Sequence, residues 1–350
     1  MPRQPIYAYI LVLLFLSPGL VHAAPNGQQL YLQHCAACHG NEGNGGVGVP
    51  LALPAFQASV DDQFLVDTVR LGRPGRVMPG FSFLKQQEIH AIVTHIRTWV
   101  TATPPEFGKA RIKGDIKRGK QLYAQHCTAC HGANGEGGHG TGVTFSRPRD
   151  LPIIAPSLNN SGFLNAASDQ LIKKTLIEGR KGTPMLSAVE RGLTEKDVDD
   201  VVAFVRSFED HSIPADHLDF AAEPLTMEYE SPFSFDKTIE KVKQAVIGMN
   251  FRVIREQKLE EGLVEQGKEN PKQVMVYFCN FQLLNEALAV DPRVGLFLPC
   301  RVTILEEKGK VKLVAINPKR LSGLFNNNEL NKLCEGMYET YTEIMEEATL

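Results

Sequence analysis

Apolar residues recur at the spacing of an α-helix in two separate parts of this chain. The spacing i, i+3, i+4, i+7 places four side chains along one helical face, which is then expected to be buried. The residues are Ile89, Ile92, Val93 and Ile96 in the first part and Val198, Val201, Val202 and Val205 in the second. The pattern therefore predicts two amphipathic helices of the same design.

After Pro214 the pattern changes. Leu225, Met227 and Tyr229 alternate with polar residues, as they would in a half-buried strand. Further strand-like runs occupy 251–254, 274–279, 302–305 and 311–316, and helical stripes occupy 239–249 and 330–345. This alternation predicts an α+β module at the end of the chain.

The first two thirds of the chain contain an internal repeat. Residues 27–39 match 119–131 at an offset of 92 positions, and residues 62–78 match 169–185 at an offset of 107. The second copy therefore carries 15 extra residues between the two blocks. Because each copy ends in one of the two amphipathic helices, we expect two helical domains of one design.

Each copy carries one Cys-x-x-Cys-His motif. The residues are Cys35, Cys38 and His39 in the first copy and Cys127, Cys130 and His131 in the second. Two thiols at this spacing can bond the two vinyl groups of a haem, and the following imidazole can ligate its iron. The motifs predict two covalently attached c-type haems, with their iron, as cofactors. Zinc ribbons also use paired Cys-x-x-Cys, but the histidine after both motifs disfavours zinc.

The first 23 residues have the pattern of a secretion signal. Arg3 precedes an apolar run from Ile6 to Leu16, and cleavage is expected after Ala23. This core of 11 residues is shorter than the ~20 that a spanning helix needs. We expect a periplasmic protein exported by a cleaved signal peptide; the alternative is a periplasm-facing protein with an uncleaved N-terminal anchor.

Length and charge limit the remaining choices. Removing 23 of the 350 residues leaves 327, enough for two or three domains. The formal net charge of −3 becomes −4 without Arg3, which argues against general nucleic-acid binding.

The two copies resemble class I cytochromes c of the small bacterial type over 25–103 and 112–212. In that family the first and last helices cross, with a glycine and an aromatic residue near the crossing. The residues that fit are Gly27, Tyr31 and Trp99 in the first copy and Gly119, Tyr123 and Phe208 in the second. The resemblance implies all-α cytochrome c domains.

The resemblance also implies a ligand set for each iron. His39 and His131 are the proximal ligands, and Met78 and Met185 the distal ones, because each methionine precedes the last helix of its copy. Leu186 departs from the family, which has proline or glycine near this methionine. His139 is the rival ligand for the second iron, but we expect it to face solvent.

Residues 225–350 resemble the domain-of-unknown-function family 302. The resemblance rests on the stretches 276–280, 288–292, 294–302 and 315–318. Cys279 and Cys300 have three interpretations: buried packing, a disulfide, or a site for a metal or sulfur species. Cys334 is expected in the core.

The predicted organisation is a multidomain protein with two all-α domains and one α+β domain. A signal peptide (1–23) precedes cytochrome c domains at 25–103 and 112–212, with linkers at 104–111 and 213–224 before the α+β domain at 225–350. We expect an electron carrier between a redox protein donor and acceptor, rather than an enzyme with its own substrate. A membrane-bound oxidase or reductase is a candidate partner, and homodimerisation a candidate role for the last domain, beside binding and sensing.

Two alternatives remain open. One is a sulfur-compound oxidoreductase that uses Cys279 and Cys300, with the haems as electron acceptors. The other is a haem-based redox sensor.

Overall fold

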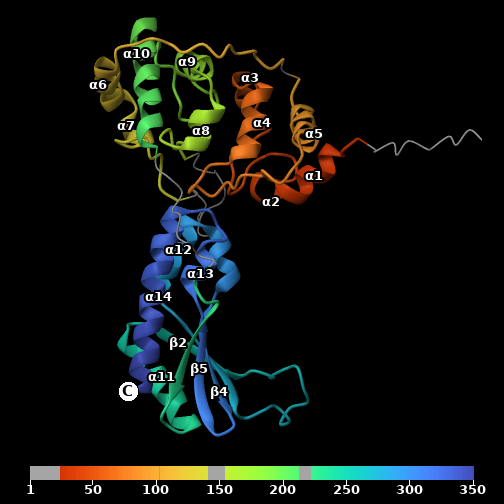
Figure 1. The fold of residues 1–350 in the computed structure, drawn as a ribbon, viewed down its shortest axis with the longest axis vertical. Helices are drawn as coiled ribbons and strands as arrows, with labels where there is room; N and C mark the ends of the chain where they lie inside the picture. The colour runs from red at the N-terminus through yellow and green to blue at the C-terminus, as the bar shows by residue number, and fades with distance from the viewer. Residues whose placement is uncertain (1–23, 102, 141–153, 213–221) are drawn as a thin grey trace, which may run out of the picture.

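The structure is a computed structural model that describes residues 24–101, 103–140, 154–212 and 222–350. Two helical units lie side by side, and an elongated α+β unit extends from their lower edge (Figure 1). The expected signal peptide and most of the 213–224 linker lie outside the described residues. Among the described residues no helix is both long and apolar enough to cross a membrane.

The first unit contains five helices. They are α1 (Gly27–His34), α2 (Ala36–His39), α3 (Pro54–Ser59), α4 (Asp62–Leu71) and α5 (Gln86–Arg97). The side chains of Asn26 and Asp61 cap α1 and α4 by accepting hydrogen bonds from backbone N–H groups of their first turns. The amphipathic pattern at 89–96 is confirmed, because all four of its apolar residues are buried in α5.

The second unit repeats this order. It consists of α6 (Ile116–His126), α7 (Thr128–His131), α8 (Ser161–Ala166), α9 (Asp169–Glu178), α10 (Glu195–Arg206) and the 3₁₀ turn η1 (Ser207–His211). The stretch just before α6, predicted as a linker, packs on this unit: Gly108 donates to the side chain of Gln170, and Arg111 forms an ion pair with Glu209.

The expected helix crossings are present in both units. A Cβ atom at Gly27 would lie 2.0 Å from the carbonyl oxygen of Ala91 in α5, and one at Gly119 would lie equally close to that of Asp200 in α10. Only glycine allows the two helices to approach so closely. An aromatic pair lies beside each crossing. The ring centroids are 5.0 Å apart for Tyr31 and Trp99 and 6.1 Å apart for Tyr123 and Phe208.

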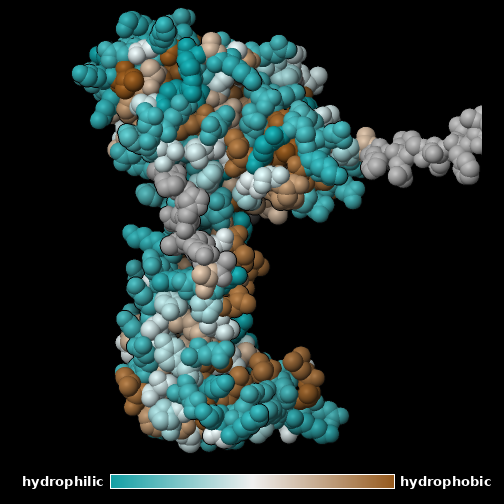
Figure 2. All heavy atoms as spheres, viewed as in Figure 1, coloured by the Kyte–Doolittle hydropathy of each residue, from teal (hydrophilic) through white to brown (hydrophobic). Residues whose placement is uncertain are grey.

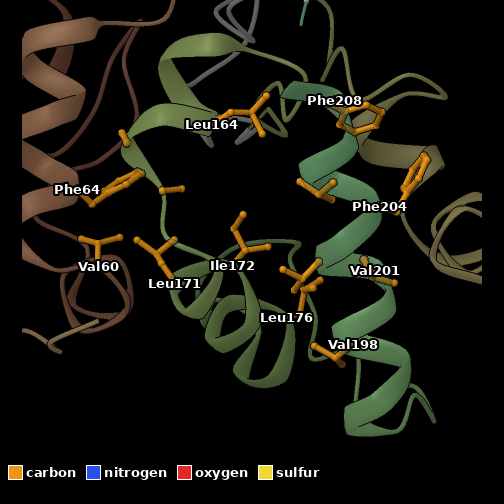
Figure 3. Close-up of a cluster of buried hydrophobic side chains, with 14 of the residues drawn as sticks. Val60, Phe64, Leu164, Leu171, Ile172, Leu176, Val198, Val201, Phe204 and Phe208 are labelled. Carbon is orange, nitrogen blue, oxygen red and sulfur yellow. The ribbon is translucent and has the colours of Figure 1, made fainter. Parts of the chain in front are cut away.

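The two units share one hydrophobic core. Val60 and Phe64 of the first copy face Leu164 and Leu171 of the second, and the cluster continues to Val198 in α10 (Figure 3). The repeat therefore forms a packed pair of domains rather than two independent ones.

The third unit is a five-stranded antiparallel sheet with helices. Its elements are β1 (Thr226–Ser231), α11 (Phe235–Gly248), β2 (Arg252–Lys258), β3 (Gln273–Cys279), α12 (Phe281–Val290), η2 (Pro292–Phe297), β4 (Cys300–Glu307), β5 (Lys310–Ile316), α13 (Pro318–Ser322) and α14 (Asn328–Thr349). The strand order is β1-β5-β4-β3-β2. Side chains of α11 and α14 pack on the sheet to form its core. The predicted α+β class is confirmed.

The third unit meets both helical units at one end. Asn326, in the turn before α14, contacts the loop after α4, and Glu329, in the first turn of α14, contacts Gly140 in the second unit. Figure 2 shows that the face of the helical units in this view is mainly hydrophilic, with scattered hydrophobic residues.

Candidate haem sites

Each Cys-x-x-Cys-His motif forms a short helical turn. Cys35 ends α1 and begins α2, which contains Cys38 and His39. Cys127 has the same place between α6 and α7, and Cys130 lies within α7. All four thiols are free, as thioether attachment of a haem requires.

One hydrogen bond orients each proximal histidine. The Nδ1 atom of His39 lies 2.8 Å from the carbonyl oxygen of Val49, and that of His131 lies 3.0 Å from the carbonyl oxygen of Pro156. A carbonyl only accepts, so Nδ1 carries the proton and Nε2 keeps its lone pair for a metal. Burial lowers the pKa of both imidazoles, which favours the neutral, ligating form.

A tyrosine fixes the end of each motif. The Tyr31 hydroxyl donates to the carbonyl oxygen of Gly40 at 2.7 Å, and the Tyr123 hydroxyl donates to that of Gly132 at 3.0 Å. Burial raises the pKa of both phenols, so they remain donors at neutral pH. The sequence placed these tyrosines at the helix crossings but gave no sign of this second role.

Two arginines at equivalent repeat positions lie where the copies meet. The guanidinium of Arg73 lies over the ring of Phe163 in the second copy, and that of Arg180 lies over the ring of Phe56 in the first, at 5.9 and 5.2 Å. Arg180 also donates to the hydroxyl of Ser59 across the boundary. Each copy thus places a cation on an aromatic residue of the other.

Neither arginine forms an ion pair with a carboxylate among the described residues. Burial lowers the pKa of Arg73 to about 10 and also lowers that of Arg180. The Nε atom of Arg180 is buried with no hydrogen-bond partner in the described part of the chain. A buried cation is costly without an anion nearby. Haem carries propionate carboxylates, so these two arginines fit a haem-bearing pair of domains.

The two methionine-bearing loops close in the same way. Arg73 N donates to Met78 O at 2.8 Å, and Arg180 N donates to Met185 O at 2.7 Å. Both methionines are half-buried, and Met185 packs against the shared core. The structure therefore gives the loops a common design, while methionine ligation stays a prediction.

His139 is placed as expected. Its side chain is 95 % exposed, and Nδ1 lies 3.8 Å from a carboxylate oxygen of Glu329 in the third domain. The interpretation as a solvent-facing residue is confirmed.

The three remaining cysteines are free thiols near one end of the third domain. Cys300 and Cys334 line an apolar cavity of about 90 Å³. Burial raises the pKa of Cys300 to about 11 and of Cys334 to about 12, and it also raises that of Cys279. Reactive thiols have a lowered pKa instead, so this environment favours packing over chemistry.

Family models match all three domains. Residues 22–96 match the model described as cytochrome C oxidase, cbb3-type, subunit III, residues 116–209 match cytochrome c, and residues 227–348 match the domain of unknown function DUF302. Cytochrome c55X of Stutzerimonas stutzeri is 36 % identical over 88 residues, covering 23 % of this chain and 77 % of that protein. The chain belongs to the c-type cytochromes.

The cytochrome is also similar to subunits of cbb3-type oxidases over part of their length. A Cbb3-type cytochrome c oxidase subunit CcoP from Azospirillum sp. (strain B510) is 24 % identical over 199 residues, 53 % of this chain and 62 % of that protein. The chain thus spans about three fifths of the length of this relative. A DUF302 protein structure from Bacillus stearothermophilus is 22 % identical, covers 36 % of this chain and 99 % of that one, and has a TM-score of 0.34.

The cytochrome c and CcoP-like families bind covalently attached c-type haem. This cytochrome therefore has two c-type haems as its cofactors, and a DUF302 domain follows the cytochrome domains. The predicted architecture of tandem cytochrome c domains and an α+β domain is confirmed.

Proposed function

We propose that this cytochrome is a periplasmic carrier that passes single electrons between a redox protein donor and acceptor. The observation that carries the proposal is the matched pair of sites, each with two free thiols, an oriented histidine and a methionine-bearing loop. A bound haem supplies a one-electron couple at its iron.

The chain's own residues decide what reaches each iron. His39 and His131 would hold the two irons through Nε2, and Met78 and Met185 would hold them through their thioethers. Irons held by two side chains each would have no place for a substrate, so the sites would act in electron transfer. Methionine also raises the potential relative to a second histidine.

Contact between the two copies supports transfer from one site to the other. The shared core and the crossed pairs of Arg73 with Phe163 and Arg180 with Phe56 hold the copies together. Electrons could then enter at one copy and leave from the other. The similarity to cbb3-type oxidase subunits supports a membrane-bound oxidase or reductase as one partner.

The DUF302 domain is proposed as a binding, dimerising or sensing module. The raised pKa values of Cys279 and Cys300 count against the alternative of a sulfur-compound oxidoreductase. A sensor that reports the redox state of the haems is favoured by one observation, namely the direct contact between this domain and the Met78 loop.

The matched methionines provide the test. We expect Met78→Ala and Met185→Ala each to abolish the thioether-to-iron absorption of one haem, to lower its potential and to allow carbon monoxide to bind the reduced protein. Each variant is the control for the other, because the unchanged site reports that the protein is folded. If neither variant changed the spectrum or bound carbon monoxide, the proposed ligation would be wrong.

A further inference from the structure

The DUF302 domain holds the Met78 loop through one asparagine. Asn326 Oδ1 accepts from Gly75 N at 3.0 Å, and Nδ2 donates to the carbonyl oxygens of Arg73 and Met78 at 3.1 and 2.8 Å. The backbone adds a fourth bond, from Val77 N to Asn326 O at 2.7 Å. A single residue of the third domain thus bonds four residues of the loop 73–78.

An ion pair reinforces this contact. Arg76 pairs with Glu329 in the first turn of α14 and also donates to the carbonyl oxygen of Gly138 in the second copy. The other carboxylate oxygen of Glu329 accepts from Gly140 N at 2.9 Å. All three domains therefore meet at Arg76 and Glu329.

In the second copy the equivalent loop is closed by its own side chain, without a contact from the third domain among the described residues. Thr183 occupies the repeat position of Arg76, and its hydroxyl donates to Arg180 O at 2.8 Å and accepts from Met185 N at 3.1 Å. Arginine has no such hydroxyl. The first loop consequently takes its extra closure from Asn326, whereas the second loop supplies its own.

Backbone geometry separates the two loops further. Val77 has a φ of 65°, in the left-handed region that β-branched residues rarely adopt. The second copy has Pro184 at this position, whose ring fixes a negative φ. A strained residue persists only where its surroundings hold it. Here the holding group is the Asn326 carbonyl, which accepts from Val77 N.

A polar network holds the segment around Asn326 in place. Arg293 donates to Asp291 and to Phe325 O, next to Asn326. The side chain of Asn327 donates to the same carboxylate of Asp291 at 3.4 Å. These bonds fix the turn whose Asn326 holds the methionine loop.

We propose that Asn326 is a positioning residue for Met78, through which the DUF302 domain keeps the first haem closed and sets its potential. The inference rests on the proposed ligation by Met78. A partner that displaced Asn326 would loosen the methionine and lower the potential of the first haem alone. The second haem, whose loop is closed by Thr183, would not respond.

The test replaces Asn326 by glycine. Asn326 has a φ of 49°, in the left-handed region, which glycine adopts without strain. Asn326→Gly therefore preserves the backbone conformation and removes three side-chain hydrogen bonds. The matched control is Asn250→Gly, because Asn250 also has a positive φ, of 61°, and contacts neither haem loop through a hydrogen bond that the described residues show.

In Asn326→Gly we expect a weaker thioether-to-iron absorption, with a loss no larger than the loss in Met78→Ala. The reduction potential of one haem should also fall. The rate of carbon monoxide binding should rise at least about tenfold, because the lost hydrogen bonds favoured the closed loop. Asn250→Gly should match the unsubstituted protein. Glu329→Gln should also weaken the absorption, lower the potential and speed carbon monoxide binding. It replaces Asn326→Gly in the experiment if the glycine variant yields no folded protein.

Two outcomes separate the inference from the proposed function. If Met78→Ala loses the absorption but Asn326→Gly and Glu329→Gln behave like Asn250→Gly, the positioning role is wrong and the ligation stands. If Met78→Ala itself changes nothing, the ligation fails and the inference fails with it. Adding Asn326→Gly to Met78→Ala should produce no further gain in carbon monoxide binding; a further gain contradicts an action through Met78.

Discussion

At the scale of single residues, burial and one or two hydrogen bonds set the chemistry of each group. The carbonyl oxygens of Val49 and Pro156 fix the protonated nitrogen of the two histidines and leave the other for iron. Burial keeps the two imidazoles neutral and able to bind a metal. In the third domain it keeps the thiols of Cys300 and Cys334 protonated and unreactive beside an apolar cavity.

The first prediction concerns these thiols. A raised pKa means that the thiolate is scarce at neutral pH and increases only as the pH approaches about 11 for Cys300 and about 12 for Cys334. Alkylation of the folded protein at pH 7 to 8 should therefore be far slower than alkylation of the unfolded chain, and should accelerate as the pH is raised. Mass spectrometry of peptides after timed alkylation measures this.

The contrary result is also clear. Rapid alkylation of Cys279 or Cys300 in the folded protein at neutral pH would restore the oxidoreductase alternative, since that activity needs an accessible thiolate.

At the scale of elements, the two copies use one ion pair in two environments. Arg206 of α10 pairs with Asp169 at the start of α9, and Arg97 of α5 pairs with Asp62 at the start of α4. The aspartate side chain is 2 % exposed in the second copy and 58 % exposed in the first. The same contact should therefore differ in its effect on stability.

We predict that Asp169→Ala lowers the free energy of unfolding by about 3–5 kcal/mol, because it removes the buried carboxylate that pairs with Arg206 and accepts from Ile112 N, and leaves Arg206 with Glu209 alone. Its repeat counterpart Asp62→Ala should cost about 0–1 kcal/mol, because water already surrounds that carboxylate. Guanidinium denaturation, followed by the haem absorption of each variant, measures both. Equal losses in the two variants would contradict this account of burial.

The repeat explains how much of these elements the sequence could predict. Helical periodicity was enough for α5 and α10, the resemblance to cytochromes c implied the crossing helices α1 and α6, and alternation was enough for the sheet. The short helices α3 and α8 were missed, because Phe56 and Phe163 show no local period and owe their place to arginines of the other copy. Contacts between distant segments leave no local pattern to detect.

At the scale of the whole molecule, three domains meet around the methionine loop of the first copy. Residues 326–329 lie about 250 positions away in the chain, yet they bond this loop through side chain and backbone. The sequence showed arginine where the repeat has threonine, at Arg76 and Thr183, but the partner of that arginine became visible only in the fold. The asymmetry between the copies therefore arises from the third domain.

The entire arrangement depends on haem at both motifs. Intact mass spectrometry of the denatured, exported protein tests this most directly, because thioether bonds survive unfolding whereas simple coordination does not. The account predicts a chain heavier by the mass of two haems, with one attached to each Cys-x-x-Cys-His peptide after digestion. A chain that carries no haem, or only one, would contradict it.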